Sequence, residues 1–82
     1  MNTQIEKKNT FCIYEGSYMF DSVDTTLNIS PDFAEMKLAK AIEYRESDKY
    51  WASIRIGDIE RRYKIIDDVF TETMVIDWSE IE

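Results

Sequence analysis

The chain has 82 residues, with ten Lys or Arg against seventeen Asp or Glu and a formal charge of −7. This length allows one hydrophobic core, and an apolar fraction of 44% is typical of a folded domain. The sequence contains no His and one Cys, which excludes a His-based catalytic triad, an internal disulfide and a multi-cysteine zinc site.

The N-terminal part of the chain changes character after a short polar stretch. Residues 1–9 lack apolar periodicity, so we expect a flexible N-terminus followed by a single compact domain at residues 10–82. Residues 10–15 are rich in aromatic and β-branched side chains, which predicts the first strand.

Two further extended segments are predicted next. Gly16 and Ser17 indicate a turn, and residues 18–20 return from it as a strand. Residues 21–24 interrupt the pattern with polar side chains. Apolar and polar residues then alternate over residues 25–29, which predicts a third, short strand.

The following segment carries a clear helix start signal. Ser30 is a good N-cap, Pro31 suits the first helical position, and Asp32 favours the positive end of the helix dipole. The spacing of apolar residues predicts a helix over residues 31–46 with one apolar face. That face consists of Phe33, Ala34, Leu38, Ala41, Ile42 and Tyr44.

Residues 50–56 and 59–66 both alternate and are separated by Gly57 and Asp58, which predicts a two-residue hairpin. One face pairs Ile56 with Ile59, Ile54 with Arg61, Ala52 with Tyr63 and Tyr50 with Ile65. The other face pairs Arg55 with Glu60, Ser53 with Arg62 and Trp51 with Lys64. We expect an ion pair between Arg55 and Glu60, and a cation–π contact between Trp51 and Lys64. The alternative is a helix that starts at Asp58.

Asp67 and Asp68 are predicted to turn the chain into a last strand over residues 69–78. One face of it would carry Phe70, Met74, Ile76 and Trp78, and the other Val69, Thr71, Thr73, Val75 and Asp77. The predicted fold class is therefore α+β, with one helix packed on an antiparallel sheet of four to five strands in the order ββ(β)αβββ. The sheet face away from the helix is expected to be exposed to solvent.

No pattern in the sequence predicts an enzyme, a cofactor or a metal site. Cys12 lies among apolar residues with no His to activate it, so we expect a buried structural thiol. We expect Asp67 and Asp68 to form a solvated turn and not a pair of carboxylates for acid–base catalysis. Asp21 and Asp24 lack the spacing and the terminal Glu of a calcium loop, and two glycines are too few for a phosphate-binding loop.

Negative charge is concentrated at the C-terminal end, since residues 67–82 contain six acidic residues and no basic one. The predicted partner-binding residues are Asp67, Asp68, Phe70, Glu72, Asp77, Trp78 and Glu80. Carboxylates with aromatic anchors complement a basic groove, so we predict a DNA-mimicking inhibitor that occludes a basic surface of a nucleic-acid-processing protein. Charge reversal at Asp77 and Glu80 is expected to weaken binding more than reversal at Glu43 and Glu46.

Two alternatives use the uncovered sheet face. One is an accessory or immunity-type subunit that binds a protein partner, or a second copy as a homodimer, through Trp51, Arg62 and Tyr63. The other is a weak binder of single-stranded nucleic acid through Trp51, Arg55, Arg62 and Lys64, which the net charge of −7 disfavours.

In size, acidity and lack of catalytic machinery, the chain resembles the small inhibitors encoded by phages and mobile elements, such as anti-CRISPR and anti-restriction proteins, and immunity proteins. This resemblance rests on gross properties and gives no residue a role. The sequence shows no apolar run long enough to span a membrane and no secretory signal, and its negative charge opposes binding to anionic lipid. With one unpaired Cys, we expect a cytoplasmic protein.

Overall fold

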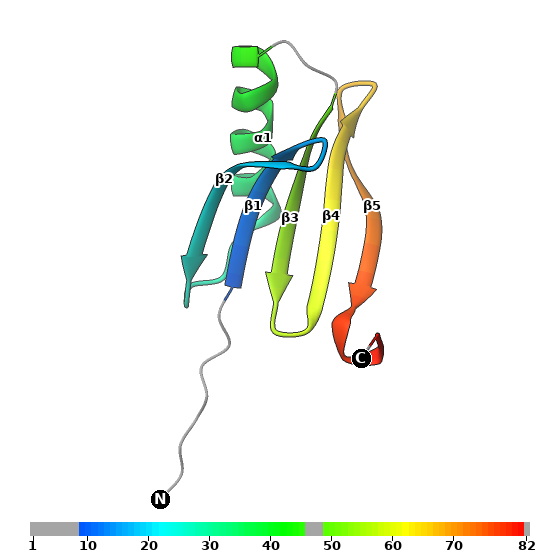
Figure 1. The fold of residues 1–82 in the computed structure, drawn as a ribbon. Coiled ribbons are helices and arrows are strands. Elements are labelled where there is room, and N and C mark those ends of the chain that lie inside the picture. The colour runs from blue at the N-terminus through cyan, green and yellow to red at the C-terminus, as the bar shows by residue number, and fades with distance from the viewer. Residues whose placement is uncertain (1–8, 46–48, 82) are drawn as a thin grey trace, which may run out of the picture.

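The computed structural model describes residues 9–45 and 49–81, which form one helix packed on a sheet (Figure 1). The elements in chain order are β1 (Asn9–Glu15), β2 (Tyr18–Thr25), α1 (Pro31–Arg45), β3 (Tyr50–Ile56), β4 (Ile59–Ile66), β5 (Val69–Asp77) and the short 3-10 helix η1 (Trp78–Glu80). The fold is α+β, as predicted. The expected flexibility of residues 1–8 lies outside the described residues, and β1 begins one residue earlier than predicted.

All five strands form one antiparallel sheet in the order β2-β1-β3-β4-β5 (Figure 1). β2 and β3 both run antiparallel to β1, so they run in the same direction as each other. Two such strands need a crossover connection, and α1 provides it. β2 and β5 are left as the two edges of the sheet.

β2 differs from the prediction because it runs without interruption over Tyr18–Thr25, so residues 21–24 belong to the strand. Residues 26–30 form the loop to α1 and not a separate strand. A shift in the β1–β2 register accommodates Phe20, whose ring packs edge-on against Tyr50 at 5.5 Å. Polar side chains are tolerated in this strand because an edge strand of an antiparallel sheet faces water on one side.

α1 begins as predicted. The Ser30 hydroxyl accepts a hydrogen bond from the Phe33 amide at 3.1 Å, and the Ser30 carbonyl accepts one from the Ala34 amide at 3.2 Å. The buried core consists of Phe11, Ile13, Ala34, Leu38, Ala41, Tyr50, Ala52, Ile54 and Tyr63. Phe33 and Tyr44 were predicted on the apolar face, but they are 37% and 79% exposed. At about 3.6 residues per turn both lie at the same margin of that face, and Phe33 still packs edge-on against Phe11 of β1, with ring centroids 5.6 Å apart.

β3 and β4 form the predicted hairpin, with Ala52 opposite Tyr63 and Arg55 opposite Glu60. The alternative of a helix starting after the turn is wrong. Gly57 takes a φ of 60°, which glycine adopts without a steric penalty and which suits a two-residue hairpin turn. Turn chemistry and alternation together therefore specified this register.

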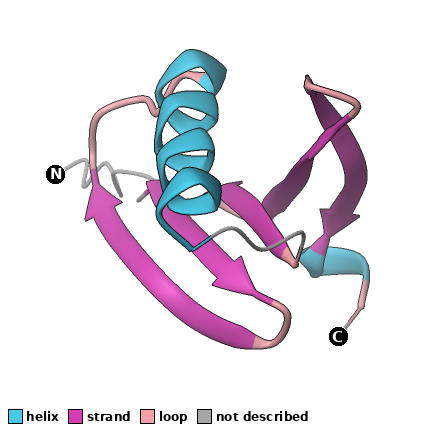
Figure 2. Cartoon of the chain, turned by 90° about the horizontal axis from the view of Figure 1, so that it is seen from above, coloured by secondary structure: helices cyan, strands magenta, loops and turns pink. Residues whose placement is uncertain are grey.

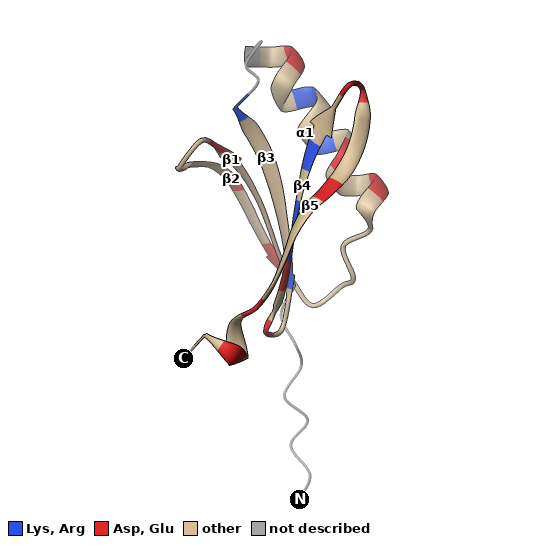
Figure 3. Cartoon of the chain, turned by 90° about the vertical axis from the view of Figure 1, so that its right-hand side faces the viewer, with Lys and Arg blue, Asp and Glu red and all other residues tan. Residues whose placement is uncertain are grey.

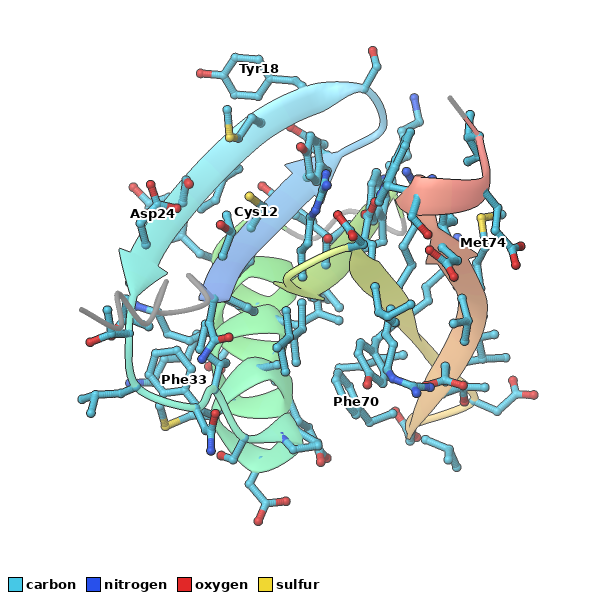
Figure 4. All side chains as sticks on the ribbon, turned by 90° about the horizontal axis from the view of Figure 1, so that it is seen from below. Cys12, Tyr18, Asp24, Phe33, Phe70 and Met74 are labelled. Atoms are coloured by element: carbon cyan, nitrogen blue, oxygen red, sulfur yellow. The ribbon has the colours of Figure 1, made fainter. Side chains whose placement is uncertain are left out.

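The side-chain directions in β5 differ from the prediction. A register shift between Arg62 and Tyr63 in the β4–β5 ladder inserts one extra residue into β5. Phe70 therefore lies on the helix side and Met74 on the opposite side, as Figure 4 shows, although strict alternation placed both on one face. A bulge of this kind changes the phase of a strand without leaving a mark in a period-two pattern.

The hairpin of β4 and β5 curves away from α1, and in Figure 2 its turn stands apart from the helix on the right. α1 packs mainly over β3. No residue of β5 is buried. β5 therefore contributes to the core only through residues such as Phe70, which is half-buried and packs against it.

Candidate binding surfaces

The predicted acidic residues lie along one edge of the sheet and do not form one compact patch. Asp67 and Asp68 form the exposed turn between β4 and β5, whereas Asp77 and Glu80 lie at the other end of β5 (Figure 3). Residues 69–76 of β5 separate the two pairs, by roughly 30 Å at about 3.3 Å per residue. Glu72 lies between them in a solvent-exposed ion pair.

The two aromatic residues of that predicted site point to opposite sides of the sheet. Phe70 stacks on Tyr63 on the helix side, with ring centroids 4.8 Å apart. Trp78 lies on the other side, where its indole Nε1 donates a hydrogen bond to a Glu60 carboxylate oxygen at 2.9 Å. Both rings are half-buried by contacts within the chain, so they help to hold the hairpin in place.

The sequence analysis did not predict that exposed apolar side chains along β5 belong to a candidate binding surface. Val69, Met74 and Val75 are 61%, 48% and 49% exposed. Edge strands are commonly protected against pairing by Lys, Pro or a covering element, and β5 contains neither residue. We call residues 67–80 the β5 edge. The absence of Lys, Arg and Pro from this segment was a signal visible in the sequence.

The side of the sheet opposite α1 is the second candidate surface, and we call it the open face. Glu60 lies at its centre and is 7% exposed. Its carboxylate accepts three hydrogen bonds, from the Ser53 hydroxyl at 2.7 Å, from Arg62 Nε at 2.9 Å and from the Trp78 indole at 2.9 Å. A buried carboxylate with this many donors is compensated within the chain.

Two predicted contacts of the open face involve different partners in the structure. The ion pair of Glu60 is made with Arg62 and not with Arg55, which lies opposite it in the ladder. The cation over the Trp51 ring is also Arg62, at 4.8 Å, and not Lys64. A planar guanidinium can stack on a ring and donate to a carboxylate at the same time, which a lysine ammonium cannot do as well.

Trp51 is enclosed between its two neighbours. The Tyr14 ring stacks on it at 4.3 Å with an interplanar angle of 9°, and its indole nitrogen donates to the Gly16 carbonyl at 2.8 Å. β1 and β4 flank β3, so Tyr14 and Arg62 approach Trp51 from its two sides. A nucleobase needs a free ring face for stacking, so this arrangement gives the single-strand hypothesis little support.

Arg55 and Trp78 form a second cation–π pair on the open face. The Arg55 guanidinium lies 5.4 Å from the indole centroid, and its Nε donates to the Gly57 carbonyl at 2.9 Å. The Trp78 amide donates to the Asp58 carbonyl at 2.8 Å, which ties η1 to the β3–β4 turn. Both side chains are therefore held in defined positions.

Burial raises the pKa of Glu60, but hydrogen bonds from Arg62, Ser53 and Trp78 and the charge of Arg62 lower it more, so that the pKa lies below its ordinary value of 4.5. For Tyr14, burial and then the neighbouring Cys12 raise the pKa above 10.0. At neutral pH the open face therefore holds an ionised Glu60 and a protonated Tyr14.

A hollow of about 520 Å³ opens on this face. Its lining residues are Thr10, Cys12, Tyr14, Ser53, Arg55, Glu60, Arg62 and Trp78. Cys12 is buried, as predicted, and its sulfur lies 3.6 Å from the Ser22 hydroxyl oxygen. Figure 4 shows Cys12 on the side of β1 away from the helix. The hollow thus combines two guanidinium groups, one carboxylate and two aromatic rings.

Within residues 9–45 and 49–81, no group of three His, Cys, Asp or Glu is arranged to hold a metal ion. Over the same ranges, no helix has the length and apolar character needed to cross a membrane. No family model, curated protein or solved structure matches the chain. The function is therefore inferred from the geometry and charge of these two surfaces.

Proposed function

We propose that the protein is a binding protein whose β5 edge docks an extended, basic segment of a partner protein. One observation carries this proposal: β5 is an edge strand with no buried residue, and Val69, Met74 and Val75 are exposed along it. A partner strand added to β5 would cover these side chains and pair the outward main-chain groups. Strand addition gives affinity through the main chain and specificity through alternate side chains.

The charge of the β5 edge indicates the chemistry of the partner. Residues 67–82 contain six acidic residues and no Lys or Arg, so a strand bearing Lys or Arg complements them. A second copy of this chain is disfavoured, because pairing two β5 edges would bring like charges together. Opposite charges also speed encounter, so association with the partner should slow steeply as salt is added.

Surfaces rich in Lys and Arg are typical of proteins that bind nucleic acid phosphates. An acidic strand bound there would occupy the place of the phosphates. The protein would then act by occlusion, as an inhibitor of a nucleic-acid-processing partner of the anti-CRISPR or anti-restriction kind. Binding of this type needs no catalytic group, and the chain contains no His.

Hydrogen exchange with a defined peptide tests the proposal. The probe is a nine-residue peptide, the length of β5, in which Lys alternates with Val, and the control alternates Glu with Val. We expect the Lys peptide to slow exchange of β5 amides, to lose this effect as salt rises, and the Glu peptide to leave exchange unchanged. Protection of β2 in place of β5, or protection by neither peptide, contradicts the proposal.

A pair of double variants separates the β5 edge from net charge. Asp67→Asn with Asp68→Gly removes two charges and keeps the turn, because Asn and Gly readily adopt the φ of 51° and 65° found there. Glu35→Gln with Glu43→Gln removes two exposed charges from α1. Glu46, the other control named from the sequence, lies outside the described residues. Only the first double variant should weaken Lys-peptide binding severalfold, and equal weakening would show that net charge alone matters.

A further inference from the structure

We propose that the hollow on the open face is a binding site for a small monocarboxylate with an apolar body, and that Arg55 holds the carboxylate. This site shares only Trp78 with the β5 edge, since its other lining side chains come from β1, β3 and β4 on the side of the sheet away from α1. Its ligand is a small molecule and not a partner strand.

The charges in the hollow leave one cation without a carboxylate. Glu60 is the acidic residue among those that line it, and its charge is matched by Arg62, whose Nε lies 2.9 Å from a carboxylate oxygen. Arg55 makes no ion pair with a described residue, and its Nε donates to the neutral Gly57 carbonyl. The hollow therefore carries one uncompensated positive charge, which a single negative charge complements.

Arg55 is held in position before a ligand arrives. Its guanidinium lies over the Trp78 ring, and that ring is fixed at two points, by its amide on the Asp58 carbonyl and by its indole nitrogen on Glu60. A side chain that is already ordered loses less conformational entropy on binding than a free arginine. Arg55 should therefore bind an anionic ligand more strongly than a mobile, fully exposed arginine would.

The shape of the site indicates the class of ligand. With Nε occupied, the guanidinium still has its two terminal amino groups, and a planar fork of this kind matches the oxygens of a carboxylate. A volume of about 520 Å³ lies within the roughly 300–1,000 Å³ of small-molecule sites. The rings of Tyr14 and Trp78 in the lining offer contact to an apolar body. A doubly charged phosphate carries more negative charge than Arg55 alone can balance, and the Glu60 carboxylate would repel it.

Titration of the full chain with N-acetylphenylalanine, followed by the NMR signals of the Arg55 Nε–H and the Trp78 indole N–H, tests the site. We expect saturable shifts of both signals, with N-acetylphenylalanine amide binding at least about tenfold more weakly because it lacks the charge. Equal binding of the acid and the amide, no saturable shift with the acid, or tighter binding of phenyl phosphate would each overturn the proposal.

Matched variants locate the ligand. Arg55→Gln should weaken binding of N-acetylphenylalanine by about tenfold, and Arg55→Lys, which keeps the charge but not the planar fork, should weaken it less. Arg61→Gln removes the same charge from an exposed ion pair with Glu72 and should leave binding unchanged. An equal loss in the Arg61 and Arg55 variants would show that the effect is not local. The double variant at Asp67 and Asp68 tests only the β5 edge, so the two proposals fail separately.

Discussion

The strands β1 and β3, which lie under α1, and the edge strand β5 show the same alternation of apolar and polar residues. Of these, only β1 and β3 bury residues in the core. In β1 and β3, Phe11, Ile13 and Ile54 are buried against the helix. In β5 no residue is buried, and exposed apolar side chains lie on both sides of the strand. Alternation therefore marks a face that can be buried, and a second layer decides whether it is buried.

The largest expected difference between the two regions is in stability. Leu38→Ala creates a cavity at a fully buried position of α1, which should lower the free energy of unfolding by about 3 kcal/mol. Val75→Ala changes a side chain that is 49% exposed on β5, and its effect should stay within about 0.5 kcal/mol. Urea unfolding measures both values. Similar losses for the two variants would show that the hairpin contributes to the core as much as α1 does.

The ion pairs of the hairpin sharpen the comparison, because one contains a buried carboxylate and the other is exposed on both sides. Glu60→Gln removes the charge that three donors share, and should cost about 2 kcal/mol of unfolding free energy. Glu72→Gln breaks a pair whose side chains are 41–50% exposed, and should cost less than about 0.5 kcal/mol. Chemical denaturation of both variants provides the test, and a larger effect at Glu72 would contradict the central role given to Glu60.

The pH dependence of stability follows from the lowered pKa of Glu60. A carboxyl group whose pKa is lower in the folded than in the unfolded chain stabilises the fold above its ordinary pKa, here 4.5. This contribution is lost as the pH falls below that value and through the folded pKa. The difference in unfolding free energy between wild type and Glu60→Gln should therefore be constant at neutral pH and shrink in acid. Growth of the difference in acid would give the opposite sign and contradict the assignment.

The smallest expected effect is at the turn of the hairpin. Asp68 has a φ of 65°, in the left-handed region that glycine adopts without a steric penalty. Asp68→Gly should raise the free energy of unfolding by about 0.5 kcal/mol, because it relieves that conformation and removes one of two adjacent like charges. Asp58→Gly is a control, since Asp58 has no positive φ. Thermal unfolding of the two variants checks this, and an equal gain in both would argue against relief of the left-handed conformation.

Most of the architecture followed from local signals. Ser30 caps the helix where the sequence placed the cap, and the five β3–β4 pairs from Ala52–Tyr63 to Ile56–Ile59 occur in the predicted register. Capping and two-residue turns depend on a few neighbouring residues, so a sequence shows them directly. The extra residue in β5 and the continuous β2 were missed, since an edge strand tolerates bulges and polar residues that alternation does not register.

The placement of the candidate residues in the fold was predicted in part. The sequence placed Trp51, Arg55, Arg62 and Lys64 on one uncovered face, but it did not show that Glu60 and Trp78 join Arg55 and Arg62 into one network. Trp78 reaches that network because the extra residue changes the phase of β5 and the Trp78 amide donates a hydrogen bond to the Asp58 carbonyl in the β3–β4 turn. The composition of residues 67–82 indicated an acidic segment. It did not show that the acidic residues are spread along a sheet edge, because that arrangement follows from the nine-residue length of β5.

The chain alone was sufficient to specify its helix, its turns, one hairpin register and the negative charge of its last segment, because each depends on residues close together in sequence. Three-dimensional packing was needed to settle which alternating strand is covered and which guanidinium meets Glu60. These outcomes depend on how far each strand lies from α1 and on side chains brought together across the sheet, and that information is carried by contacts between residues far apart along the chain.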